Sequence, residues 1–176
     1  MTVQPTYHWQ FNEGAGSVST DRISGVKATF AKSALQLHGR IGNAVLVHGG
    51  SGAINLGKEV GQFGTSDFTI AFGILIRDNH DQNDLDIIGN CSVKGHGNWV
   101  SLRLLEKTKL FFEVDEDSNG KHYIAARTNP LALRDKTGIM SRLYAKDPRS
   151  SSISMGNYRR KLHQARVLPI SLTAMI

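Results

Sequence analysis

The stretch FGTSDFTIAFGILIRD, residues 63–78, decides the fold class of this chain. From Phe68 to Ile76 mostly apolar residues run straight through a glycine, and the stretch ends on a charged pair. The alternation predicts a β-strand that is buried on at least one face. Gly73 lies inside this strand, where a glycine has no side chain to pack.

Similar short segments fill most of the chain before Pro130, and glycine-rich turns separate them. They are TYHWQFNEG, SALQLHG, NAVLVHG, GAINLG, DFTIAFGILI, LDIIGNC, NWVSLRLLE, KLFFEVD and HYIAART. No long helical pattern and no alternation of strands with helices interrupts the series. Short strands at this spacing predict an all-β protein, an antiparallel β-sandwich.

Composition fits one globular domain. The chain has 176 residues, of which 40% are hydrophobic and 20% are charged. Its first residues lack the basic and apolar pattern of a signal peptide, and no apolar run reaches the ~20 residues of a membrane span. The single cysteine, Cys91, excludes an internal disulfide.

The net charge of +6 is unevenly distributed. Residues 1–130 hold 12 Lys and Arg against 13 Asp and Glu, whereas residues 131–176 hold 9 against 2. We therefore divide the chain into a β-sandwich domain, residues 1–136, and a basic tail, residues 137–176. The tail shows no interleaving of basic and aromatic residues and no known nucleic-acid-binding module, so no nucleic-acid partner is expected.

Four motifs in order carry a family resemblance. They are HWQFNEGAG (residues 8–16), DRISG (21–25), GRIGNAVLVHGGSGAINLG (39–57) and FGTSDFTIAFGILIRD (63–78). Together they resemble bacterial laminin-G-like domains of the concanavalin A-like lectin and glucanase superfamily. The resemblance implies a jelly-roll sandwich. In that family the position of Gly73 is usually a Trp, so we expect a core cavity there that costs about 3–5 kcal/mol.

The family pattern stops after LALRDKT (131–137), where two further strands are expected. The third base of each codon can be joined to the first two bases of the next codon from Thr137 onward. With allowed choices at the degenerate positions, this neighbouring frame encodes both missing strands, as W-H-H-V-A-V-V-R and L-K-L-Y-I-D-G. In that frame the codons of Met140 and Ser141 force a Val (GTC), and those of Met155 and Gly156 force a Gly (GGG). We hypothesise a frameshift near Thr137, which makes the tail an out-of-frame or disordered segment and leaves the sandwich incomplete.

Two acidic loops are candidate metal sites. DEDSNG (115–120) matches the opening of a calcium loop, with Asp115, Asp117 and Asn119 as alternate oxygen ligands. The twelfth position is Ala126 instead of Glu, and a polar hairpin explains the same residues. The second loop, DNHDQNDLD (78–86), offers Asp78, Asp81, Asp84 and Asp86, but no ligand set is fixed and a solvated linker is the alternative.

Glucanases of the superfamily carry catalytic carboxylates on one strand, as Glu-x-Asp-x-Glu. Here EVDED gives Glu113, Asp115 and Asp117, with an Asp in place of the last Glu. We therefore expect no enzyme, and we keep a glycoside hydrolase of the glucanase type as the alternative.

The segment KGHGNW (94–99) groups His96, Asn98 and Trp99 in a glycine-rich loop. An aromatic ring and an amide can bind a sugar, because the ring stacks on the apolar face and the amide bonds the hydroxyls. A Trp buried in the core at the start of a strand is the alternative.

The resemblance implies a non-catalytic module that binds carbohydrate or protein, in some relatives with calcium, in secreted or cell-surface proteins. A truncated product of a frameshift could lack that function.

Overall fold

The computed structural model describes residues 5–39, 42–47, 52–63, 68–75, 84–90, 96–128, 139–146, 152–158 and 172–175, and the last three ranges only as backbone. Every regular element in these ranges is a strand, and every strand pair is antiparallel. The expectation of an all-β, antiparallel protein is confirmed. All nine strand segments expected from the sequence contain a strand.

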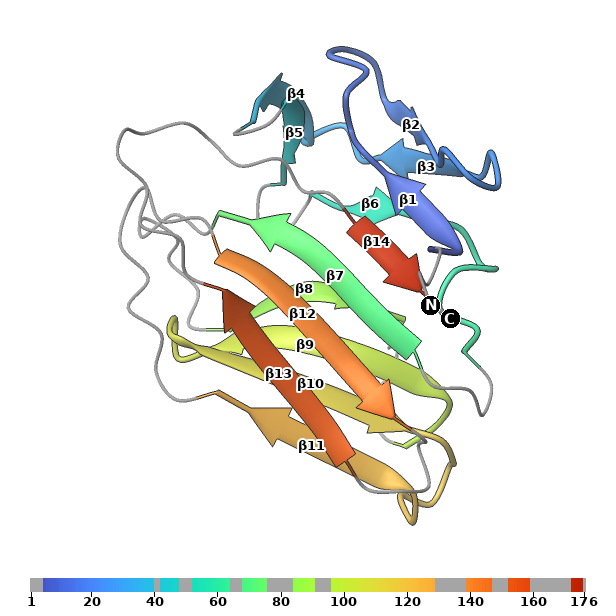
Figure 1. Cartoon of the computed structure of the whole chain (residues 1–176), viewed down its shortest axis with the longest axis vertical. Coiled ribbons are helices and arrows are strands. Elements are labelled where there is room, and N and C mark those ends of the chain that lie inside the picture. Colours follow the sequence, from blue (N-terminus) through green and yellow to red (C-terminus); the bar gives the residue numbers. More distant parts are fainter. Residues whose placement is uncertain are drawn as a thin grey trace.

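Two sheets form the body of the molecule (Figure 1). The first has the order β1 (Tyr7–Trp9), β14 (Leu172–Met175), β7 (Phe68–Ile74), β12 (Ile139–Lys146) and β13 (Ser152–Tyr158). The second has the order β11 (Tyr123–Arg127), β10 (Lys109–Asp115), β9 (Trp99–Leu105) and β8 (Leu85–Gly89). They lie one in front of the other, as in a sandwich.

Two smaller sheets lie beside this body. One joins β2 (Val18–Thr20), β3 (Lys27–Phe30) and β6 (Ile54–Asn55), and the other is the hairpin of β4 (Leu35–His38) and β5 (Asn43–Leu46). The sequence analysis did not identify β2 and β3, because each has only three or four residues and lies between turn formers.

The core fills the space between the two large sheets. Alternate residues of β7 and β10 point into it, and the ring of Phe68 meets the edge of Phe112 at 6.4 Å between centroids. The buried hydrophobic residues of the cluster are Trp9, Phe11, Ala28, Phe30, Val45, Phe68, Ile70, Phe72, Val100, Leu102, Leu104, Leu110, Phe112 and Val114. Burial of these side chains is the main stabilising term of the fold.

Gly73 does not create the expected core cavity. Phe68, Ile70 and Phe72 are buried, so the period of two places Gly73 on the opposite face of β7. The glycine replaces a side chain on that other face, and the core keeps its three large residues. The expectation of a cavity in the core was therefore wrong.

Three strands lie in the part of the segment after residue 137 that the structure describes. β12 pairs with β7 and β13, and β14 pairs with β1 and β7. These ladders use backbone N–H and C=O groups, which every residue except proline supplies, so they do not require the apolar pattern of a core strand. The reading frame of the gene is a separate question, and the frameshift stays a prediction.

The turn at DRISG is fixed by Asp21, whose side chain is buried. Its carboxylate accepts hydrogen bonds from the backbone N–H of His8 and from the N–H groups of Ile23 and Ser24, and it also accepts one from the Ser24 hydroxyl. Burial raises the pKa of Asp21, but these hydrogen bonds outweigh burial and leave the pKa below its ordinary value. Asp21 thus connects β1 to the turn that precedes β3.

Candidate functional site

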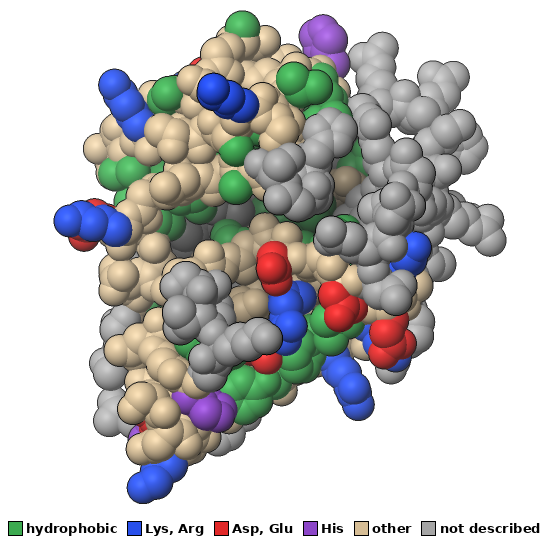
Figure 2. All heavy atoms as spheres, turned by 180° about the vertical axis from the view of Figure 1, so that it is seen from behind, with side chains coloured by type: hydrophobic (Ala, Val, Ile, Leu, Met, Phe, Trp, Pro, Cys, Tyr) green, Lys and Arg blue, Asp and Glu red, His purple; other side chains and the backbone are tan. Residues whose placement is uncertain are grey.

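The four-stranded sheet carries a polar and aromatic surface on the side away from the core. In β9 and β10 the core residues alternate with residues that face outward. We call this surface the outer face. Its residues are Asp86 and Gly89 of β8, Trp99, Ser101, Arg103 and Leu105 of β9, Lys109, Phe111, Glu113 and Asp115 of β10, and Tyr123, Ala125 and Arg127 of β11. Figure 2 looks onto the molecule from this side.

Three neighbouring rows of the outer face surround Glu113, and a further row with Leu105 and Lys109 lies beyond them. One end row contains Asp86, Arg103, Phe111 and Arg127, the middle row contains Gly89, Ser101, Glu113 and Ala125, and the other end row contains Trp99, Asp115 and Tyr123. The middle row has small side chains around Glu113. This leaves room for the longer side chains of the end rows to reach the Glu113 carboxylate.

Glu113 is the centre of the first network on this face. Arg103 donates from Nε at 3.1 Å and from Nη2 at 2.6 Å to Oε2, and the Tyr123 hydroxyl donates to Oε1 at 2.6 Å. The Glu113 side chain is only 8% exposed, while that of Arg103 is 36% exposed. A buried carboxylate is thus fully paired beneath a guanidinium that reaches solvent.

These contacts shift two pKa values. Burial raises the pKa of Tyr123, and the hydrogen bond and charge of Glu113 raise it further, to about 12. Burial lowers the pKa of Arg103, but its hydrogen bond and charge interaction with Glu113 and the charge of Asp86 outweigh burial and raise it. Both shifts stabilise the protonated partners of the Glu113 carboxylate.

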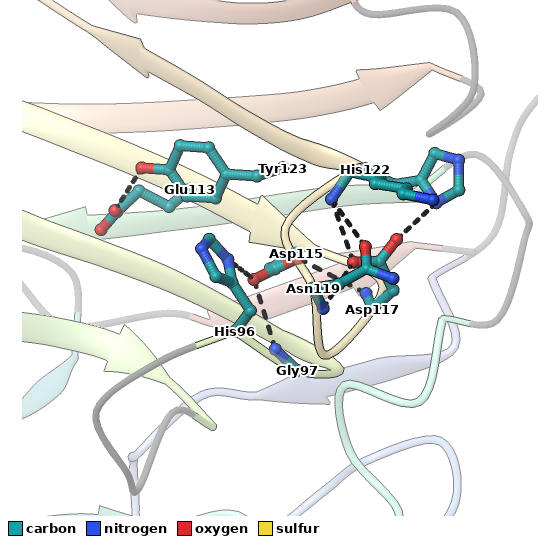
Figure 3. Close-up of polar contacts among 9 residues, drawn as sticks. His96, Gly97, Glu113, Asp115, Asp117, Asn119, His122 and Tyr123 are labelled. Atoms are coloured by element: carbon teal, nitrogen blue, oxygen red, sulfur yellow. Dashed lines mark hydrogen bonds and ion pairs between the residues drawn. The ribbon is translucent and has the colours of Figure 1, made fainter.

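Asp115 is the centre of a second network at the end of β10 (Figure 3). Its side chain is fully buried, and Oδ2 is bonded to Nδ1 of His96 at 2.6 Å and to the backbone N–H of Gly97 at 3.2 Å. The His96 ring also meets Tyr123 edge-on at 5.9 Å between centroids. Asp115 therefore fixes the segment that leads into Trp99.

The turn between β10 and β11 uses its own polar side chains. Oδ1 of Asp117 accepts from the N–H groups of Asn119 and Lys121, each at 3.1 Å, and Oδ2 lies 2.7 Å from Nδ1 of His122. Slight burial raises the pKa of Asp117, but these hydrogen bonds outweigh it and lower the pKa. Oδ1 of Asn119 accepts from the same Lys121 N–H at 3.1 Å.

The candidate calcium ligands Asp115, Asp117 and Asn119 thus bond protein groups of the hairpin and of His96. Among the described residues, no three or more His, Cys, Asp or Glu side chains form a group that could hold a metal ion. Calcium binding by this loop stays a prediction.

Of the second acidic loop, Asp78 and Asp81 lie outside the described residues. Asp84 accepts a hydrogen bond from the N–H of Glu106 at 3.1 Å, and Asp86 lies opposite Arg103 on the outer face. These two residues therefore have different surroundings.

The structure brings the candidate ligand-binding residues to one end of the outer face. His96 and Asn98 are exposed, and Trp99 is half-buried with its ring edge-on to Tyr123 at 6.1 Å. The alternative of a Trp in the core was wrong. The alternation of side chains along β9 explains the position of Trp99. Val100, Leu102 and Leu104 point into the core, so Val100's neighbour Trp99 faces the opposite side of the sheet.

The sequence analysis missed Arg103, Phe111 and Tyr123 as members of this site. The same parity could have found them, since they alternate with core residues of β9, β10 and β11. What the sequence lacked was the register between the strands, which brings residues 103, 113 and 123 together.

The glucanase-like carboxylates are only partly brought together. Glu113 and Asp115 share the outer face of β10, as expected for alternate residues. β10 ends at Asp115, so Asp117 lies in the turn, where its oxygens bond the turn backbone and His122.

A comparison with models of protein families, with curated proteins and with solved structures found no match for this chain. In the part of the chain that the structure describes, no helix is long and apolar enough to cross a membrane.

Proposed function

We propose that this chain is a non-catalytic carbohydrate-binding module of the laminin-G-like, jelly-roll type, and that its ligand binds on the outer face. The observation that carries this proposal is the position of Trp99. Its ring lies half-buried on the outer face, edge-on to Tyr123 and next to the exposed His96 and Asn98. A sugar ring packs on an aromatic ring and bonds nearby polar groups, so this arrangement suits a saccharide.

Tryptophan fluorescence tests the proposal directly. The chain has two tryptophans, and Trp9 is fully buried while Trp99 is half-buried on the proposed site. Titration with neutral oligosaccharides is expected to change the emission of the wild-type chain. Trp99→Phe removes that change and leaves the emission of Trp9 as an internal reference. An unchanged emission together with no heat of binding, for every saccharide tried, would refute the proposal.

Non-catalytic binding is favoured by the state of the three carboxylates. Both oxygens of Glu113 are paired, Asp115 is buried against His96, and Asp117 bonds the turn. A glycoside hydrolase needs a carboxyl group free to protonate the leaving oxygen. Turnover of β-glucans that is abolished by Glu113→Gln would show that the hydrolase alternative is right.

A further inference from the structure

We infer that Arg103 binds the hydroxyl groups of a neutral oligosaccharide, and that Glu113 and Tyr123 position it for this task. The inference rests on the proposed function and names the ligand class and the group that recognises it. It starts from the hydrogen-bond capacity of the guanidinium. Arg has five N–H donors, and two of them are used on the single oxygen Oε2 of Glu113. Within the described residues, no hydrogen bond uses the other three.

The guanidinium is held in place before any ligand arrives. Glu113 bonds it from below, and the Tyr123 hydroxyl fixes the other oxygen of that carboxylate. The Phe111 ring lies beside it, with 5.5 Å between Cζ of Arg103 and the ring centroid. Two direct contacts, with Glu113 and Phe111, hold a side chain that is 36% exposed, and Tyr123 holds Glu113 in turn, which leaves a rigid donor group at the surface.

Charge on this face favours a neutral ligand. Arg103 lies between two acids, because Asp86 is its partner on β8 and Glu113 is bonded to it. Over the described outer face, the cations Arg103, Lys109 and Arg127 are matched by Asp86, Glu113 and Asp115. An acidic polysaccharide requires a positive excess, and these residues do not supply one.

The length of the site favours an oligosaccharide over a single sugar. Trp99 and Arg103 are four residues apart on β9, so their Cα atoms are separated by about 13 Å along the strand. That distance exceeds one sugar ring. We therefore expect a ligand that packs on Trp99 and extends along β9 to the Arg103 position to have several units.

Calorimetric titration tests the inference with defined probes. Neutral gluco-, manno- and galacto-oligosaccharides from the monomer to the hexamer are compared with oligogalacturonates of the same lengths. Affinity is expected to rise with length for a neutral series and to stay lower for the acidic series. Acidic chains that bind more tightly than neutral ones, or an affinity independent of length, would overturn the inference.

Arg103→Lys keeps the charge but loses the fork of donors, and it is expected to weaken binding by about tenfold to a hundredfold. Arg22→Lys is the matched control, because Arg22 makes one side-chain bond, to Gln10, outside the outer face. Phe111→Leu leaves every charge in place, and a moderate loss of affinity is expected because the guanidinium loses its ring contact. Thermal unfolding of each variant establishes that it is folded.

The outcomes separate the two proposals. Binding that Trp99→Phe weakens, while Arg103→Lys and Phe111→Leu bind as tightly as the wild type, would overturn the role of Arg103 and leave the proposed function standing. Absence of saccharide binding, or binding of a protein ligand on this face instead, would overturn both.

Discussion

The hydroxyl of Tyr123 on β11 donates a 2.6 Å hydrogen bond to Oε1 of Glu113 on β10. The bond joins two strands diagonally, because the register partner of Glu113 is Ala125 and that of Tyr123 is Asp115. The register partner of Glu113 is the small residue Ala125, which leaves room for the Tyr123 side chain beside it. The pair therefore depends on the alternation of large and small side chains across the sheet.

This pair predicts a late-titrating tyrosine. The pKa of Tyr123 is raised to about 12, whereas an unfolded tyrosine has a pKa of about 10. Ultraviolet difference absorbance is expected to show a phenol that titrates near pH 12, and Tyr123→Phe should remove it. If all tyrosines of the folded wild type titrate near their ordinary pKa, the hydrogen bond to Glu113 is absent.

The same shift makes stability depend on alkaline pH. The folded chain holds the Tyr123 proton more tightly than the unfolded chain, so this stabilisation is complete below about pH 10 and is lost as the pH rises toward about 12. Denaturant unfolding measures the free energy of unfolding at each pH. Between about pH 10 and pH 12 this free energy should fall less steeply with pH in Tyr123→Phe than in the wild type. Equal slopes in both proteins would contradict the assignment.

Asp21 predicts sensitivity to acid. Its pKa is below the ordinary value, so its stabilisation is present above the unfolded pKa and is lost as the pH falls through the lower folded pKa. Asp21→Asn keeps the size but weakens the bonds to the turn, with an expected loss of about 2 kcal/mol in the free energy of unfolding at neutral pH. Asp117→Asn, in an exposed turn, is the comparison and should lose less. Equal losses would count against the central role of Asp21.

Gly120 predicts a steric effect that reaches the outer face. Its φ is +70°, and an added Cβ would lie 2.4 Å from Cε1 of His96. Gly120→Ala is expected to cost about 1–2 kcal/mol for the left-handed backbone, and more because His96 must leave Asp115. Gly25→Ala is the matched control, since Gly25 has a φ of +77° with no atom within 4 Å of the added Cβ. Chemical denaturation measures both, and equal losses would show that His96 moves without cost.

The frameshift hypothesis predicts a more stable chain in the neighbouring frame. The two re-read strands fall on codons 137–145 and 149–156, close to β12 (Ile139–Lys146) and β13 (Ser152–Tyr158). The chain as given is expected to melt below about 60 °C, and the re-read chain above it, by circular dichroism. A coding sequence whose neighbouring frame lacks these strands, or a cooperative transition of the given chain above that temperature, would contradict the hypothesis.

Sequence patterns predicted the strands of the sandwich that are long and alternate. Phe68, Ile70 and Phe72 are a direct case, because burial on one face of a strand requires period two. The expectation that Gly73 faces the core was wrong. The family pattern shows that a Trp is usual at this position, but it does not show on which face of the strand the position lies. The strands β12 to β14 were not predicted. Their hydrogen bonds to neighbouring strands use backbone groups, which leave no pattern of side chains in the sequence.

The candidate site was predictable only in part. His96, Asn98 and Trp99 stand together in the sequence, and a local motif can find them. Arg103, Glu113 and Tyr123 lie on three different strands, and each is ten residues from the next in the sequence. The register between the strands brings them together, and a local sequence pattern does not specify that register. The Asp117 turn was found because Asp, Asn and Gly act within a few residues.

The pairing of β1 with β14 also bears on how the protein is made. Tyr7 lies opposite Ala174, so the first strand gains its ladder only after almost the whole sequence shown has left the ribosome. Until then both β1 and one side of β7 are open edges, and such edges recruit other chains. We expect the nascent protein to depend on chaperones and to fold slowly, as the large sequence separation of this contact requires.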